Sequence, residues 1–179
     1  MNNVFITGFM ATGKTLIGRG LAQRLGMPFL DADVEIEREA GMSVADVFGR
    51  LGEAEFRARE RRTLERLCSL ESAVIATGGG AVVDPRNRAA MRASGTLVCL
   101  TADPDTILGR LGSGGDRPLL ADANGREARI RSLLGERAVA YGDADLIVDT
   151  SQRSAEEVAD AIVEWLAGAR VLPIRNSSR

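Results

Sequence analysis

A glycine-rich segment near the N-terminus constrains this sequence more than any other feature. Residues 8–15 read G-F-M-A-T-G-K-T, which matches the P-loop pattern G-x-x-x-x-G-K-[ST]. An apolar run at residues 4–6 precedes the pattern, and residues 16–25 follow it with helical spacing, so the loop joins a strand to a helix. In that context the backbone N–H groups of the loop can surround a polyphosphate at the positive end of the helix. The segment therefore predicts a nucleoside-triphosphate site.

The lysine of this pattern, Lys14, is the only lysine in the chain. The sequence contains 23 Lys and Arg residues, and all the others are arginine. A compact ammonium fits between two phosphates where a planar guanidinium does not, which is a physical reason for lysine at this one position. A chance match in a glycine-containing loop is therefore disfavoured. We expect Lys14 to contact the β- and γ-phosphates and Thr15 to hold Mg²⁺.

Length and charge exclude several classes of protein. A chain of 179 residues suits one domain, which we expect to span residues 1–170, followed by a disordered tail at residues 171–179. The net charge of −2 provides no basic field for nucleic acid, and no apolar run approaches the roughly 20 residues of a membrane span. We also find no signal-peptide pattern. The sequence therefore predicts a cytoplasmic monomer with small-molecule partners, and neither nucleic acid nor membrane as a partner.

Strand-like and helical segments alternate along the chain. Short apolar strands are expected at residues 3–7, 28–30, 73–76, 96–100 and 145–149. This alternation predicts an α/β fold, a three-layer sandwich with a five-stranded parallel sheet and right-handed crossovers. In such a fold, ligands bind at the carboxyl ends of the strands.

Two groups of residues follow predicted strands and are therefore candidates for a site. Asp31 and Asp33 follow the second strand, where an extended backbone would point them in different directions, and Asp33 also suits the N-cap of the next helix. Gly78, Gly79 and Gly80 follow the third strand, where the lack of side chains lets a ligand approach the backbone. The alternative for the glycines is a flexible turn.

The most loop-like stretch of the chain is L-G-S-G-G-D-R-P-L-L at residues 111–120. Its glycines permit motion, and it carries Arg117. Phosphoryl-transfer enzymes use a mobile segment with an arginine to close over ATP and exclude water. We therefore expect a lid at about residues 112–125. The alternative is a surface loop with a solvated arginine.

Other motifs separate the classes of P-loop protein. No lysine follows Lys14, so the N-K-x-D motif of GTPases is absent, and no LSGGQ-like signature of transporter ATPases is present. A small-molecule or nucleotide kinase remains.

From about residue 3 to residue 166, the chain resembles the shikimate kinase family, a nucleoside-monophosphate-kinase-like group of P-loop folds. The resemblance rests on the order and spacing of several motifs. These are the P-loop, Asp31-x-Asp33, Phe56-Arg57-x-x-Glu60, Gly78-Gly79-Gly80, Arg117-Pro118-Leu119-Leu120 and Arg137-x-x-x-Tyr141.

The resemblance implies transfer of the γ-phosphoryl group of ATP to the 3-hydroxyl of shikimate, with Mg²⁺ as cofactor, in chorismate and aromatic amino acid biosynthesis. It implies catalytic roles for Lys14, Asp33 and Arg117, with Asp33 orienting or deprotonating the hydroxyl, and a metal site at Thr15 and Asp31. The nucleotide-binding residues that it implies are Ala11, Thr12, Gly13, Lys14, Thr15, Leu16, Arg110, Arg117 and Arg153. The shikimate-binding residues that it implies, partly on helices at about residues 33–60, are Asp33, Phe48, Phe56, Arg57, Glu60, Gly78, Gly79, Gly80 and Arg137.

One position departs from the family pattern, because Ala11 stands where a further P-loop glycine is usual. Alanine disfavours positive φ, so we expect a loop conformation that alanine tolerates, with ATP still bound. Two alternative functions remain open at this point. A gluconate-type kinase would share the P-loop and lid but not Asp33, Arg57, the triple glycine and Arg137 together. A nucleotide-binding module without catalysis would have lost lid or acceptor residues.

Overall fold

The computed structural model describes residues 2–111 and 125–169. The first part of the chain contains β1 (Asn3–Gly8), α1 (Lys14–Leu25), β2 (Phe29–Asp31), α2 (Ala32–Ala40), α3 (Val44–Asp46), the π-helical turn η1 (Val47–Leu51), α4 (Gly52–Cys68) and β3 (Val74–Ala76). The second part contains the 3₁₀ turn η2 (Ala81–Val83), α5 (Pro85–Ser94), β4 (Gly95–Thr101), α6 (Pro104–Leu111), α7 (Arg126–Gly142), β5 (Leu146–Asp149) and α8 (Ala155–Ala169). Arg117 with nearly all of the expected lid, and the expected tail, lie outside the described residues.

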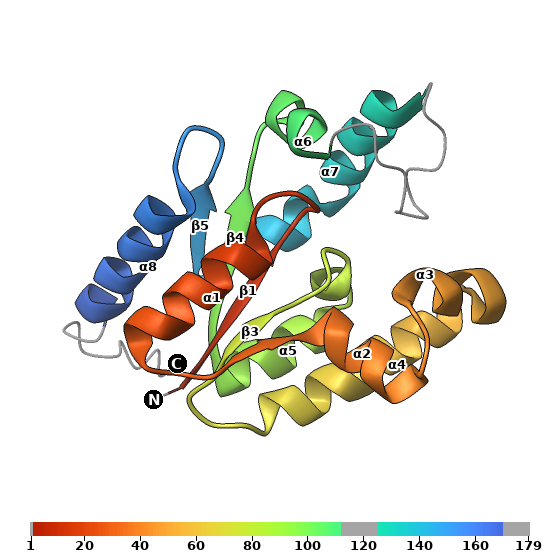
Figure 1. The fold of residues 1–179 in the computed structure, drawn as a ribbon, viewed down its shortest axis with the longest axis horizontal. Coiled ribbons are helices and arrows are strands. Elements are labelled where there is room, and N and C mark those ends of the chain that lie inside the picture. The colour runs from red at the N-terminus through yellow and green to blue at the C-terminus, as the bar shows by residue number, and fades with distance from the viewer. Residues whose placement is uncertain (1, 112–124, 170–179) are drawn as a thin grey trace, which may run out of the picture.

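The five strands form one parallel sheet in the order β2-β3-β1-β4-β5 (Figure 1), which confirms the predicted sheet. In the sheet, β3 and β2 lie on one side of β1, and β4 and β5 lie on the other side, so the order of the strands reverses at β1. Such a reversal places a crevice at the carboxyl ends of the central strands. The register pairs Ile6 with Ala76, so that the P-loop after β1 and the triple glycine after β3 leave the same edge.

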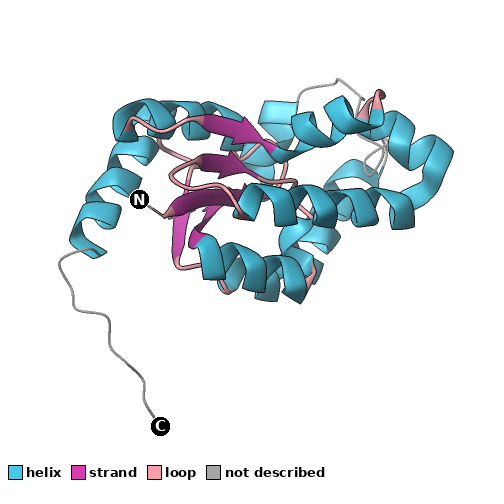
Figure 2. Cartoon of the chain, turned by 90° about the horizontal axis from the view of Figure 1, so that it is seen from below, coloured by secondary structure: helices cyan, strands magenta, loops and turns pink. Residues whose placement is uncertain are grey.

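Alternation along the strands divides the core between the two faces of the sheet. Val4 and Ile6 pack in a cluster with residues of α1 and α8, whereas Phe5 packs in a cluster with residues of α4, α5, α6 and α7. Helices therefore cover both faces (Figure 2), and the three-layer prediction is confirmed. No helix in the described ranges is long and apolar enough to cross a membrane.

A small third cluster extends the molecule beyond the carboxyl edge of the sheet. Ile36, Val47 and Phe56 are buried together, and they join α2, η1 and α4. Figure 1 shows α2, α3 and α4 grouped to one side of the sheet. This helical group forms one wall of the pocket described below.

The start of α2 differs from the sequence-based expectation. Asp31, and not Asp33, is the N-cap, because Oδ1 of Asp31 accepts a hydrogen bond from the N–H of Asp33 at 3.1 Å. β2 ends at Asp31 and the helix begins at Ala32, so Asp33 lies in the first helical turn. The expectation that an extended backbone points the two aspartates in different directions is therefore wrong, because Asp33 is helical and because residues two apart on a strand share a face.

Two further details of the helices also differ. The capping-box segment S-V-A-D at residues 43–46 would suit a short helix through Phe48, but α3 ends at Asp46, and Phe48 lies in the π-helical turn that follows. Leu16, which fits the apolar spacing of α1, is 67% exposed and does not belong to the core. Its position in the first turn of α1 places it next to the P-loop, on the side opposite to the buried face of that helix.

Two glycine substitutions test this account of the fold in opposite directions. Gly8→Ala is expected to lower the free energy of unfolding by about 3 kcal/mol or more, because the new Cβ would lie 2.1 Å from the carbonyl oxygen of Leu100 at a φ of 137°. Gly135→Ala is expected to raise it by about 0.5–1 kcal/mol, because Gly135 lies inside α7 with open space around it. Urea unfolding measures the change in the free energy of unfolding of each variant. A Gly8→Ala variant as stable as the parent would contradict the close approach of β1 and β4.

Candidate active site

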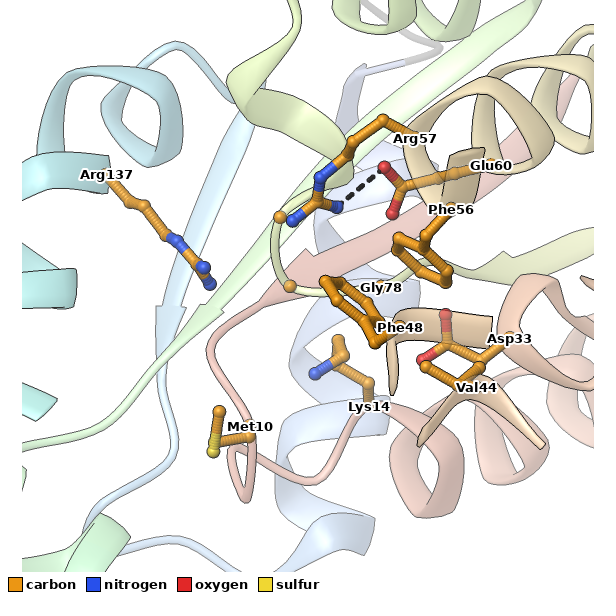
Figure 3. Close-up of a pocket in the computed structure, with 12 residues that line it drawn as sticks. Met10, Lys14, Asp33, Val44, Phe48, Phe56, Arg57, Glu60, Gly78 and Arg137 are labelled. Carbon is orange, nitrogen blue, oxygen red and sulfur yellow. Dashed lines mark hydrogen bonds and ion pairs between the residues drawn. The ribbon is translucent and has the colours of Figure 1, made fainter. Parts of the chain in front are cut away.

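A cavity of about 100 Å³ lies between the P-loop, the helices α2 to α4 and α7 (Figure 3). It collects every residue that the resemblance assigns to the shikimate site, together with the P-loop lysine. The lining residues are Met10, Lys14, Asp33, Val44, Phe48, Phe56, Arg57, Glu60, Gly78, Gly79, Gly80 and Arg137. A larger cavity of about 470 Å³ adjoins it and shares Arg57, Glu60, Gly80 and Arg137.

Arg57 is held in place on several sides. Its Nη1 donates to Oε2 of Glu60 at 2.8 Å, and its Nη2 donates to Oε1 of Glu53 at 3.2 Å. Its guanidinium carbon lies 5.1 Å from the ring centroid of Phe56 and 5.9 Å from that of Phe48, within the range of cation–π attraction. Burial works against the charge, but the hydrogen bonds and charges of Glu60 and Glu53 together outweigh it and raise the pKa of Arg57. Arg57 is therefore a fixed positive charge.

Glu60 is the buried partner of this ion pair. The residue is 2% exposed, and burial raises the pKa of its carboxyl group while the charge of Arg57 opposes that rise. The negative charge of Asp33 adds to the raised pKa of Glu60. The two carboxylates face the same small space, because both approach the position of a Cβ on Gly78 to within about 3 Å. A buried pair of this kind contributes little net stability compared with apolar packing. Its effect is to orient Arg57 toward the pocket.

Arg137 approaches the same pocket from α7, on the far side from Arg57 (Figure 3). It is 8% exposed, and its guanidinium carbon lies 5.7 Å from the ring centroid of Phe9. Within the described ranges, no carboxylate forms an ion pair with it. Burial of a charge without a counter-charge is costly. Two guanidinium groups that line one cavity, one of them without an ion pair, form a site suited to a carboxylate ligand.

The triple glycine packs directly against these charged groups. A Cβ on Gly78 would lie 2.9 Å from Oδ1 of Asp33 and 3.0 Å from Oε1 of Glu60. A Cβ on Gly80 would lie 2.7 Å from Nη2 of Arg57. Side chains at these positions would displace the groups that line the pocket, so the glycines are required by close approach and are more than a flexible turn.

The P-loop side of the site contains the residues expected to bind phosphate and metal. Nζ of Lys14 donates to the carbonyl oxygen of Phe9 at 2.9 Å. Oγ1 of Thr15 donates to Oδ2 of Asp31 at 2.9 Å, so a hydroxyl and a carboxylate oxygen from separate segments lie together at the start of α1. Hard oxygen ligands of this type suit Mg²⁺, which usually binds one or two protein groups together with phosphate and water.

The remaining residues expected at the nucleotide lie at different places. Arg110, on α6, reaches the P-loop, where its Nη1 lies 3.3 Å from the carbonyl oxygen of Ala11. Leu16 is exposed beside the loop. Arg153 is exposed in the turn between β5 and α8, where it lines a surface hollow together with Trp165.

Ala11 adopts the conformation that alanine disfavours. Its φ is 60°, in the left-handed region, which costs a non-glycine residue roughly 1–2 kcal/mol. The expectation of a loop conformation comfortable for alanine is therefore wrong. The loop keeps the backbone shape that a glycine would have, and this strain has to be balanced by contacts elsewhere.

Two residues of the pocket were missed in the sequence analysis. Met10 lies in a variable position of the P-loop, and its place between two motif glycines was a signal that its side chain could reach the site. Val44 belongs to the short helix α3, and it lines the pocket because that helix packs against α2 and η1. No local pattern marks Val44, since its position depends on the packing of the helical group.

A parallel sheet with a P-loop at its carboxyl edge, next to a pocket of arginines and a carboxylate, defines the class of small P-loop kinases. The family model described as shikimate kinase matches residues 10–167. A shikimate kinase of Geobacter sulfurreducens is 44% identical over 164 residues, which cover 92% of this chain and 90% of that protein. A shikimate kinase of Desulforudis audaxviator is 46% identical and covers 93% and 87% of the two chains. The chain belongs to the shikimate kinase family.

Solved structures agree with this membership. The structure of shikimate kinase from Acinetobacter baumannii in complex with shikimate superposes with a TM-score of 0.92 at 35% identity, over 96% of each chain. A gluconokinase from Sinorhizobium meliloti superposes with a TM-score of 0.59 at 17% identity, over 94% of this chain and 93% of that one, a likeness of fold alone.

The strain at Ala11 can be tested by removing it. Ala11→Gly is expected to raise the free energy of unfolding by up to about 1 kcal/mol, because relief of the left-handed strain exceeds the extra freedom of glycine in the unfolded chain. ADP affinity is expected to change by less than about twofold, because the loop shape stays the same. Urea unfolding and calorimetric titration with Mg²⁺ and ADP measure the two quantities.

Ser72→Gly is the matched control, since Ser72 also has a φ of 60° but lies before β3, at the opposite edge of the sheet. It is expected to leave ADP binding unchanged. An Ala11→Gly variant that is less stable than the parent would contradict the assignment of strain to Ala11.

Proposed function

We propose that this protein is a shikimate kinase, which transfers the γ-phosphoryl group of ATP to the 3-hydroxyl of shikimate and forms shikimate 3-phosphate and ADP. The observation that carries the proposal is the convergence of Arg57, Arg137 and Asp33 on one cavity that Lys14 of the P-loop also lines. The first two suit a carboxylate, the third suits a hydroxyl, and the lysine suits the phosphate that is transferred. Membership of the family and the overall likeness to a shikimate complex support this reading.

On the acceptor side, Arg57 and Arg137 bind the substrate carboxylate through charge-assisted hydrogen bonds. Glu60 keeps Arg57 oriented, and the rings of Phe48 and Phe56, with centroids 4.4 Å apart, wall the pocket. Asp33 accepts a hydrogen bond from the 3-hydroxyl and orients its oxygen toward the γ-phosphorus. A new bond forms between that oxygen and the phosphorus, the bond from the phosphorus to the β–γ bridging oxygen breaks, and Asp33 stabilises or accepts the proton.

On the donor side, backbone N–H groups of residues 11–16 and the ammonium of Lys14 bind the phosphates. Thr15 and, through water, Asp31 would hold Mg²⁺, which neutralises negative charge on the phosphates when it is bound. Arg110 and Arg153, with Leu16, are proposed to lie along the nucleoside. Arg117 is proposed to reach the transferring group from the lid at about residues 112–125.

The proposed function also implies a domain organisation, an oligomeric state and a place in metabolism. We infer a single domain over residues 1–170 whose substrate-binding helices lie at about residues 33–60. We also infer a cytoplasmic monomer that takes ATP and shikimate and does not bind nucleic acid. The function places the enzyme in the biosynthesis of chorismate and the aromatic amino acids.

The test of the proposed function compares acceptors. ADP release with Mg²⁺ and ATP is measured with shikimate, with gluconate and with nucleoside monophosphates. Turnover that depends on shikimate is the expected outcome. Turnover with gluconate alone would favour the gluconate-type kinase, and binding of ATP without turnover on any acceptor would favour a nucleotide-binding module.

Substitutions in the acceptor half of the site should separate chemistry from binding. Asp33→Asn is expected to lower kcat about 10²–10⁴-fold, because the hydroxyl loses its carboxylate partner. Arg57→Ala is expected to lower kcat/KM for shikimate at least about 100-fold, because one of two charged partners of the carboxylate is removed and Glu60 stays buried. Steady-state kinetics and ADP titration measure both effects.

The control is Arg92→Ala, a surface arginine of α5 that pairs with Asp143 at 2.8 Å and lies outside the pocket. Its kinetics should match those of the parent. Full activity in both Asp33→Asn and Arg57→Ala would rule out the proposed acceptor site.

The metal site is tested with Asp31→Asn. Asparagine caps a helix as well as aspartate does, so α2 should keep its start and the protein its stability. The Mg²⁺ concentration for half-maximal activity should rise roughly 10-fold or more, because the site loses a carboxylate. Asp84→Asn, at the matching N-cap of α5, should leave the Mg²⁺ dependence unchanged. An unchanged Mg²⁺ requirement in Asp31→Asn would exclude Asp31 from the metal site.

A further inference from the structure

The carbonyl groups of the P-loop are held both from within the loop and from outside it. The carbonyl oxygen of Phe9 accepts hydrogen bonds from Oγ1 of Thr12 at 2.8 Å and from Lys14 at 2.9 Å. The carbonyl oxygen of Ala11 accepts from Arg110, and that of Thr12 accepts from Oγ1 of Thr150 at 3.2 Å. In a trans peptide the N–H points away from the carbonyl oxygen. Fixing the carbonyls of Ala11 and Thr12 outward therefore fixes the next two N–H groups on the opposite side, where a phosphate would bind.

Thr150 is the residue that joins these outer contacts. It follows β5 directly and is 1% exposed. Its backbone N–H donates to the carbonyl oxygen of Thr101 at 2.9 Å. Its hydroxyl has one hydrogen to donate and lies 3.1 Å from that same oxygen and 3.2 Å from the carbonyl oxygen of Thr12. Because the carbonyl of Thr101 already accepts the N–H, we assign the hydroxyl hydrogen to Thr12. Arg110 donates to the hydroxyl of Thr150 at 3.0 Å and to its carbonyl oxygen at 2.6 Å. One buried threonine thus connects the ends of β4 and β5, the arginine of α6 and the P-loop.

The strained Ala11 explains why the P-loop needs such support. A residue with a φ of 60° keeps that conformation only when its surroundings enforce it. The peptide bonds on both sides of Thr12 carry the contacts from Arg110 and Thr150. In a chain with glycine at this position, the same shape would need less enforcement.

We propose that Thr150 is a positioning residue for the nucleotide, which acts by holding the Ala11–Thr12 segment of the P-loop in its phosphate-binding shape. The inference rests on the proposed function, because it assumes that this loop binds ATP. Thr150 does not touch the transferred group in this scheme. It acts through the backbone of the loop and through Arg110.

The alternative is that Thr150 only fastens the end of the sheet through Thr101. This alternative predicts a loss of stability with no selective effect on the nucleotide. Thr101→Val is the matched control, because it removes a hydroxyl of the neighbouring strand end whose contact is the carbonyl oxygen of Val148, at 3.4 Å, and which does not reach the P-loop.

The experiment compares Thr150→Val, Thr150→Ser and Thr101→Val in the full-length protein. Thr150→Val keeps the shape of the side chain but leaves the buried carbonyl of Thr12 without this donor. We expect KM for ATP and the Kd for ADP to rise roughly 5- to 50-fold, with KM for shikimate changed less than about twofold. Thr150→Ser should restore both nucleotide constants to near the parent values, and Thr101→Val should leave them unchanged.

A second arm uses Ala11→Gly as background. Because glycine adopts the loop shape without strain, Thr150→Val should weaken ADP binding less in this background than in the parent. If Thr150→Val does not fold, Thr150→Ser and Thr150→Ala are compared by ADP titration in both backgrounds. Thr150→Ala is then expected to bind ADP more weakly than the parent, and Thr150→Ser is expected to bind it about as tightly.

Unchanged ADP affinity in folded Thr150→Val or Thr150→Ala, or an equal loss of affinity in both backgrounds, overturns the inference. Failure of the parent protein to bind ADP would overturn the proposed function instead, so the two failures are distinguishable.

Discussion

The close approach of two backbone segments at the carboxyl edge of the sheet determines most of this structure. The N–H of Thr77 donates to the carbonyl oxygen of Ile6 at 2.9 Å, and a Cβ on Gly79 would lie 2.9 Å from the carbonyl oxygen of Gly8. The P-loop and the triple glycine are thus side by side because β1 and β3 are hydrogen-bonded in register. The distance between a phosphate bound at the P-loop and an acceptor bound at the triple glycine is therefore set by the sheet. Side chains make only small adjustments to it.

The charges of the acceptor pocket depend on that rigid edge. Arg57 with Glu60, and Arg137 on the other side, place charge in a region with little solvent, where the cost of desolvation is high. These groups do not stabilise the fold as apolar side chains would. The two aliphatic and aromatic clusters on the faces of the sheet stabilise it, and the small cluster of Ile36, Val47 and Phe56 fixes the helices that carry Arg57 and Glu60. A pocket able to bind an anionic ring is therefore compatible with a stable domain.

How far each feature could be predicted from the sequence depends on whether its cause is local. The strands and the P-loop follow from neighbouring residues, and the structure agrees with them. The segment Asp31-Ala32-Asp33 offers two candidate caps, and only the end of β2 decides between them. The glycine usual at position 11 was a signal for the left-handed φ of Ala11, but the contacts that enforce it have no local pattern. They come from Arg110 and Thr150, which are separated along the chain by 99 and 138 positions from the carbonyls that they hold. Val44 likewise reaches the pocket only through packing between helices.

The two halves of the site differ in the same way, and this difference bears on how the substrate is selected. The phosphate-binding part of the donor half is one continuous segment, so a chain that keeps the P-loop keeps the residues expected to bind phosphate. The acceptor half is assembled from α2, η1, α4, the triple glycine and α7, which meet only in the folded protein. A gluconokinase at 17% identity shares the fold, and one fold can carry different acceptor sites. Under the proposed function, the identity of the acceptor is set where helices carry Asp33, Arg57 and Arg137 to the fixed edge, and changes in those helices can alter the acceptor while the P-loop stays the same.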